Sequence, residues 1–351
     1  MEQKYQERVT GYTDNATHSP GLSSSEIGNL WNEYVDGSTA MCLLKSFLKT
    51  VEDKDIGSLL DETLEVLNQR SQMITDIFRK ENLPIPLGFS DTGDVDLNAP
   101  RLYTDYFYLY YLKCINKFEI PLGSLNFVTS TRSDVLDYYD FRSSTSTMLQ
   151  KKVTNALLTK GIDIRPPYVT TSRNIDMVKK QTFLTGFLGE KRPLLAQEVS
   201  SLFHAILSNY VGKYLLTGFR QTARSRKVRN YMDRGIDLTS KMIDSFGSIL
   251  NEEDILVPAF WDTMVTDSTV PPFSDQLMMF KTTLLNRCGI LGFSYVMINS
   301  YRHDIKAQLL KVMPSAADYA EDGLNIMIKN GWFEEPPRTV DRRELVNVPK
   351  H

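Results

Sequence analysis

Apolar residues recur along the chain with the three- and four-residue spacing of one face of an α-helix. The first such stretch begins near Ile27. Ser24 or Ser25 is expected to cap it, because a hydroxyl group can accept a hydrogen bond from a free backbone N–H. A second stretch begins at Ile56 and ends before Pro84. The pattern therefore predicts two consecutive amphipathic helices.

Two further helices are expected in the same half of the chain. The third begins near Leu102, and the fourth runs from about Arg132 to Lys160. Gly161 then provides a left-handed residue that can end the fourth helix. Pro121 falls inside the third helix, where it removes a backbone hydrogen bond and crowds the preceding turn. We expect that helix to kink or break at this point.

The four-helix pattern occurs twice. Residues of the two halves match at a separation of 172 positions in the first two helices and 170 in the last two. The matched pairs include Glu26 and Glu198, Leu30 and Leu202, Phe47 and Phe219, Glu81 and Glu253, Asn116 and Asn286, Arg132 and Arg302, Asp134 and Asp304, and Gly161 and Gly331. A repeat of this length indicates an internal duplication.

The duplication predicts an all-α fold of two tandem four-helix bundles. The bundles are expected over residues 23–168 and 196–338. Residues 169–195 are interpreted as a connector that packs across both bundles, because the segment is too apolar for a free linker. Residues 1–22 and 339–351 are interpreted as polar tails.

The connections between the second and third helices indicate a topology. Residues 84–100 and 256–272 are rich in turn-forming residues, and each segment is long enough to span a bundle when extended. Neighbouring antiparallel helices need only a short turn. We therefore expect a long crossover, as in ferritin-like four-helix bundles.

Composition limits the classes of partner. The chain has 40 basic and 43 acidic residues, a net charge of −3 that gives no overall attraction to nucleic acid. Its three cysteines are too few and too far apart for a disulfide framework, which favours a reducing, cytoplasmic compartment. No apolar run is long enough for a membrane span. A protein partner or self-association is expected.

Several motifs resemble a family of spore-forming bacilli that is known only as a domain of unknown function. The matching stretches include SSSEIGNLWNEY, NAPRLYTDYFYLYYL, GIDIRPPY and YAEDGLNIMIKNGW, and the likeness extends over residues 23–340. The resemblance implies a ferritin-like or related four-helix bundle. Some shorter relatives carry the name of spore coat proteins, and metal binding has been suggested for others. The resemblance therefore implies an association with sporulation.

The residues that could bind a metal are few. A di-iron bundle needs inward carboxylates and Glu-x-x-His motifs, and no such motif occurs. The candidates are His204 on the first helix of repeat two, and Glu65 and Asp237 at matching mid-helix positions. We expect an apolar bundle interior with no cofactor. The alternative is a ferritin-like protein that binds a transition metal such as iron or zinc.

Charged residues at the helix ends suggest a structural cluster instead. With a crossover, the first and fourth helices begin at one end of the bundle, where the second helix finishes. Each arginine is then expected to pair with carboxylates there, through its planar guanidinium. The predicted clusters are Glu26, Glu81, Arg132 and Asp134, and in repeat two Glu198, Glu253, Arg302 and Asp304.

A group of tyrosines suggests an interface. The start of the third helix carries more aromatic rings than one core-facing side can hold, and hydroxyl-bearing rings suit half-wet contacts. The residues are Tyr103, Tyr106, Tyr108, Tyr110 and Tyr111, expected between repeats or between subunits. No catalytic motif accompanies them. The sequence thus favours a non-enzymatic structural or interaction protein.

Overall fold

The computed structural model describes residues 20–170, 174–186, 191–260 and 263–343. Within them the chain is helical and contains no strand, which confirms the all-α prediction. Repeat one holds α2 (Ser24–Thr50), α3 (Lys54–Lys80), α5 (Asp105–Val128) and α6 (Ser133–Thr159). Repeat two holds α7 (Ala196–Thr222), α8 (Arg226–Asn251), α9 (Asp275–Asn299) and α10 (His303–Lys329). Two short helices, α4 (Asp91–Asp94) and η1 (Gln181–Leu184), lie in connections.

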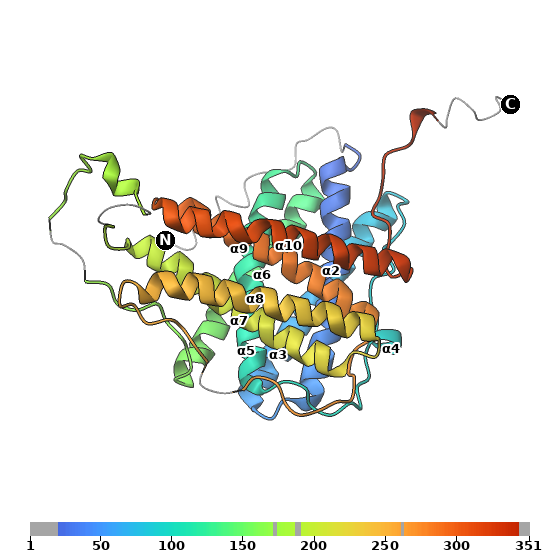
Figure 1. The fold of residues 1–351 in the computed structure, drawn as a ribbon. Coiled ribbons are helices and arrows are strands. Elements are labelled where there is room, and N and C mark those ends of the chain that lie inside the picture. Colours follow the sequence, from blue (N-terminus) through green and yellow to red (C-terminus); the bar gives the residue numbers. More distant parts are fainter. Residues whose placement is uncertain (1–19, 171–173, 187–190, 261–262, 344–351) are drawn as a thin grey trace.

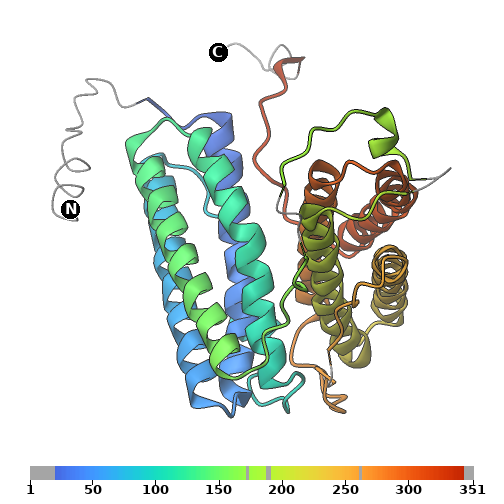
Figure 2. The same cartoon turned by 90° about the vertical axis from the view of Figure 1, so that its left-hand side faces the viewer.

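The two repeats form separate helical bundles that lie against each other. Figure 2 shows the four long helices of repeat one side by side on the left and repeat two on the right. In Figure 1 the helices of repeat two run across those of repeat one. One apolar cluster, which includes Phe47, Tyr111, Leu215 and Met278, extends through both repeats. The contact between the bundles is therefore part of the hydrophobic core.

The first helix begins one or two residues before the position expected. Ser23, not Ser24 or Ser25, is its N-cap: its hydroxyl accepts from the Glu26 N–H at 3.2 Å. The Glu26 carboxylate accepts in return from the Ser23 N–H at 2.7 Å. This reciprocal pair satisfies two backbone donors at once, which a cap at either later serine cannot do with Glu26.

Pro121 does not break its helix. The third helix, α5, runs without interruption from Asp105 to Val128 with Pro121 inside it. The proline is exposed, so the bulky ring projects outward and the packed side of the helix continues past it. The expectation of a kink or break is therefore wrong as regards a break, and a kink stays a prediction. Tertiary packing on both sides of the proline outweighs the loss of one backbone bond.

Helix directions follow from contacts at the two ends of repeat one. The Arg132 N–H at the start of α6 donates to Glu26 at the start of α2, at 2.9 Å. At the other end, the Asp53 N–H before α3 donates to Asp105 at the start of α5, at 2.8 Å. Helices α3 and α5 thus run in the same direction, and residues 81–104 connect them along the length of the bundle. The ferritin-like assignment itself stays a prediction.

The two long connections pair with each other. Val95 forms an isolated antiparallel bridge with Phe273, and Tyr103 forms one with Val265. In the repeat register Val95 matches Val265 and Tyr103 matches Phe273, so the two bridges are copies of one interaction. The repeats are therefore related by an approximate twofold arrangement about these connections.

The segment between the repeats packs only in part. Residues 174–182 are exposed, with Ile175 at 98%. Phe183 and Arg192 contact repeat two: the Phe183 ring lies against that of Tyr301, and Arg192 pairs with Glu198 at 2.7 Å. The exposed residues 174–182 therefore lie outside the packed part of the connector, and its packing across both bundles stays a prediction.

Candidate functional site

The predicted ion-pair residues of repeat one lie together at one end of the bundle. The Arg132 guanidinium contacts Glu81 at 2.6 Å and Asp134 at 2.7 Å. Glu26 is 1% exposed and accepts from the N–H groups of Thr131 and Arg132, both at 2.9 Å. Burial alone would raise the pKa of Glu26, but these backbone hydrogen bonds lower it to about 2.

Repeat two carries the same arrangement. Arg302 is fully buried and contacts Glu253 and, at 2.6 Å, Asp304. Glu198 accepts from the N–H of Arg302 at 3.2 Å. Arg192 from the connector adds a further ion pair to Glu198. Every charge in these two clusters has a partner. The clusters therefore hold the helix ends together, which is a structural role.

The three metal candidates do not lie together. Glu65 on α3 and Asp237 on α8 are exposed to solvent. His204 on α7 is half-buried at the contact between the repeats, and its burial and the nearby Lys117 and Lys113 lower its pKa to about 4. Among the described residues no group of three or more histidine, cysteine or acidic side chains is placed to hold a metal ion.

Most of the tyrosine stripe lies between the repeats. The Tyr103 hydroxyl donates to the Leu215 carbonyl of α7 at 2.8 Å. The Tyr110 ring lies edge-on to Phe260 with centroids 4.6 Å apart, and the Lys281 ammonium lies 5.2 Å from the centroid of Tyr111. Within repeat one, the Tyr108 hydroxyl is 2.7 Å from that of Thr50. Tyr106 is the exposed member, at 38%.

The centre of repeat one holds four charged side chains, one from each helix. We call Glu33, Arg70, Glu119 and Arg142 the charge quartet. Arg142 is 1% exposed and contacts Glu33 at 2.8 Å and Glu119 at 3.0 Å. Arg70 contacts Glu119 at 3.4 Å. The expectation of an apolar interior is therefore wrong for this repeat.

The quartet is joined by further hydrogen bonds, although Arg70 Nε has no partner among the described residues. Arg70 also donates to the carbonyl of Arg142 at 3.0 Å and to the hydroxyls of Thr145 and Ser146. Burial raises the pKa of Glu33 above its ordinary range, whereas the adjacent Arg142 and Arg70 lower the pKa of Glu119 in spite of burial. Two guanidinium groups thus neutralise the carboxylates from within the bundle.

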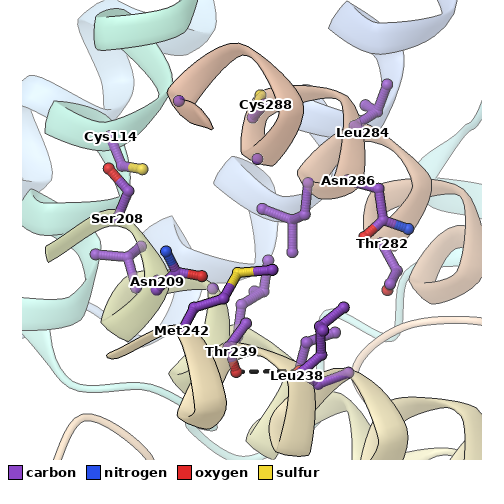
Figure 3. Close-up of a pocket in the computed structure, with 18 of the residues that line it drawn as sticks. Cys114, Ser208, Asn209, Leu238, Thr239, Met242, Thr282, Leu284, Asn286 and Cys288 are labelled. Carbon is purple, nitrogen blue, oxygen red and sulfur yellow. Dashed lines mark hydrogen bonds between the residues drawn. The ribbon is translucent and has the colours of Figure 1, made fainter. Parts of the chain in front are cut away.

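Repeat two has an apolar cavity at the matching place. The residues at the quartet positions are Ala205, Met242, Gly289 and Val312. A cavity of about 120 Å³ lies here, and Figure 3 shows the Met242 side chain extending into it with Cys114 and Ser208 side by side at one edge. Burial raises the pKa of the Cys114 thiol, so this thiol is protonated at neutral pH.

A larger pocket adjoins this cavity at the contact between the repeats. We call it the Lys117 pocket; it has a volume of about 610 Å³ and lies between α5, α7 and α9. Its lining is mostly apolar, and His204, Lys113 and Lys117 contribute polar groups. A pocket of this size with few polar groups has the form of a small-molecule site. It shares Cys114 and Ser208 with the smaller cavity.

Comparison with known families matches the chain to one family twice, over residues 11–175 and 182–345. The chain belongs to the family described as "Protein of unknown function (DUF3231)". The two matches confirm both the duplication and the resemblance inferred from the sequence. No curated protein matches the chain.

One solved structure is similar to part of this two-repeat DUF3231 chain. It is a "putative spore coat protein" from Bacillus halodurans, with 18% identity and a TM-score of 0.40. The alignment covers 43% of this chain and 98% of that one. No described helix of the DUF3231 chain is both long and apolar enough to cross a membrane.

The charge quartet of this DUF3231 chain was not predicted from its sequence, although a signal exists. Glu33 follows Leu30 by three positions and Arg70 follows Val66 by four, so both lie on core-facing stripes. Opposite charges on stripes of different helices indicate a buried pair. Repeat two has neither charge at the matching positions, so the repeat pattern does not point to these residues.

Proposed function

We propose that this protein is a non-enzymatic structural or interaction protein, associated with the spore as the family resemblance implies. The charge quartet carries the proposal. In a di-metal bundle, carboxylates from the four helices face an ion at the centre. In repeat one the two central carboxylates instead face Arg70 and Arg142, which occupy the same space as permanent cations.

The surface supports an interaction role. Apolar side chains are exposed around the mouth of the Lys117 pocket, among them Leu125 at 58% and Ile298 at 77%. Exposed apolar groups that gather at a pocket are typical of binding surfaces. The paired connections and the shared core hold this surface in one shape, as a binding platform requires.

Metal analysis tests the proposal against the metal-binding alternative. Protein purified without a histidine tag is incubated with iron(II) or zinc, passed through a desalting column and analysed for metal. We expect well under one ion per chain, and no change in Glu33→Gln. One or more ions per chain, lost in Glu33→Gln or His204→Ala, would instead establish a metal protein.

Spore association has its own test. Antibody detection in fractions of a sporulating culture of the source organism should place the protein with purified spores. Its presence only in growing cells would contradict this part of the proposal and leave the structural part standing.

A further inference from the structure

The Lys117 pocket has a counterpart on the other side of the approximate twofold arrangement. A smaller pocket of about 280 Å³, the Arg287 pocket, lies between α2, α9 and α10. In the repeat register Arg287 matches Lys117, and Asn32 of the smaller pocket matches His204. The two pockets therefore match around the cation, where α5 and α7 form one and α9 and α2 form the other; the described lining of the Arg287 pocket has no α5 residue to match the α9 side of the Lys117 pocket.

The two copies differ in the partner of their cation. Arg287 forms an ion pair with Asp36 of α2 at 3.2 Å. The residue that matches Asp36 is Ser208, and Lys117 donates to the Ser208 hydroxyl at 2.9 Å. The acid that neutralises the cation in one copy has thus been replaced by a neutral group in the other.

Lys117 has no carboxylate partner among the described residues. Its ammonium donates to the His204 carbonyl at 3.1 Å and to Ser208, which uses two of its three hydrogens. Lys113, the second ammonium of the pocket, is already paired with Asp163. Burial lowers the pKa of Lys117, because no adjacent negative charge compensates for the loss of water. An anion that binds beside a partly buried cation without a counter-ion stabilises its charged form.

Beyond the cation, the pocket is lined by aliphatic side chains. Leu122 and Leu125 of α5 face the same space as Leu291 and Ile298 of α9. Several of these groups are partly exposed to solvent, including Leu291 at 36%. A flexible alkyl chain would cover this surface and gain free energy in proportion to the apolar area buried.

We propose that the Lys117 pocket binds a long-chain monocarboxylate, with the carboxylate at the Lys117 ammonium and the alkyl chain between α5 and α9. In the Arg287 pocket the guanidinium already has a carboxylate partner in Asp36, so we expect that pocket to bind such a ligand less tightly. This inference goes beyond the structural role proposed above and is independent of it. It assigns one ligand site to the chain, although the chain carries two copies of the fold.

Titration calorimetry with dodecanoate, below its micelle concentration, tests the site. We expect one dodecanoate per chain, and binding at least about tenfold weaker in Lys117→Gln, the range for a hydrogen bond to a charged group. The matched control is Arg287→Gln, which changes the equivalent cation of the Arg287 pocket and should leave affinity unchanged. Dodecanol, which lacks the charge, should bind wild type about as weakly as dodecanoate binds Lys117→Gln.

A second variant protects the test against misfolding. Leu125→Asp lies at an exposed position of the mouth, so the protein should fold as judged by circular dichroism, yet dodecanoate should bind at least tenfold more weakly. Equal affinity of Lys117→Gln and wild type would overturn the proposal, as would dodecanol binding as tightly as dodecanoate.

Two other occupants are distinguished in parallel. Cosedimentation with phosphatidylglycerol vesicles, together with no binding of free dodecanoate, would show a membrane surface as the ligand and overturn the proposal. Sedimentation equilibrium that shows a dimer dissociated by Leu125→Asp but unaffected by dodecanoate would show that a second copy of the chain covers the pocket, with the same consequence.

Discussion

Gly123 of α5 lies so close to Arg142 of α6 that a methyl group added at Gly123 would overlap the guanidinium. Repeat two has Phe293 at the position that matches Gly123, and Val312 at the position that matches Arg142. Repeat one thus has a small residue, Gly123, opposite a large charged one. Repeat two has a large apolar residue, Phe293, opposite the smaller Val312. The charge quartet therefore requires a residue without a side chain at position 123, because the Arg142 guanidinium fills that space.

Gly123→Ala is therefore expected to lower the free energy of unfolding by about 1–3 kcal/mol, because the added methyl group displaces Arg142 from its carboxylate partners. Urea unfolding followed by circular dichroism measures the change. Gly28→Ala in α2 is the control: nothing lies near an added methyl there, so the alanine should stabilise the helix by about 0.5–1 kcal/mol. Similar behaviour of the two variants would contradict the close packing described.

Removal of one cation from the quartet should be costly. Arg142→Met leaves Glu33 and Glu119 buried with less compensation, and we expect a loss of about 3–5 kcal/mol in the free energy of unfolding. Adding Glu33→Leu to this variant should recover part of the loss, because Glu33 has no ion pair other than Arg142 among the described residues, whereas Glu119 keeps its contact with Arg70. A double variant less stable than Arg142→Met would argue against electrostatic coupling between Glu33 and Arg142.

Acid should weaken the helix-end cluster through Glu26. Its pKa is lowered from an ordinary value of 4.5 to about 2, so the folded state favours the carboxylate. Its contribution is fully present above pH 4.5 and is lost as the pH falls toward 2, by roughly 3 kcal/mol in total. Urea unfolding between pH 6 and pH 2 should show a shallower decline in Glu26→Gln than in wild type. Parallel pH curves would refute the assignment.

Limited proteolysis should cut the chain between the repeats, and the two fragments should stay associated. Lys179 and Lys180 lie in the exposed part of the connector, where trypsin has access. Brief digestion is expected to give two fragments on a denaturing gel that still elute together at the mass of the intact chain. The shared apolar core and the hydrogen bond from Tyr103 to Leu215 hold them. Separate elution of the fragments would show that the covalent connection is required for their contact.

Much of the fold could be predicted because it rests on local periodicity and on repetition. The four helices of each repeat and the turn at Gly161, with a φ of 67°, follow from helical spacing and a C-terminal glycine. The cap at Ser23 was misplaced because neighbouring serines offer the same hydroxyl, and only the contact with Glu26 decides between them.

The candidate site was harder to predict because it depends on differences between the repeats. Lys117 differs from the matching Arg287 because its partner is the neutral Ser208. Lys117 and Ser208 come from different repeats. Their contact depends on how the bundles are placed, which helical spacing does not encode. The sequence points to the imidazole of His204, whereas in the structure it is the His204 backbone carbonyl that accepts from Lys117.

The antiparallel bridges between Val95 and Phe273 and between Tyr103 and Val265 join two halves of one polypeptide. Separate subunits joined in this way would come apart on dilution, because their association depends on protein concentration. Within one chain the effective concentration of each half for the other is fixed by the connector. The Lys117 pocket, which requires both halves, therefore exists in every molecule, however scarce the protein is in the cell.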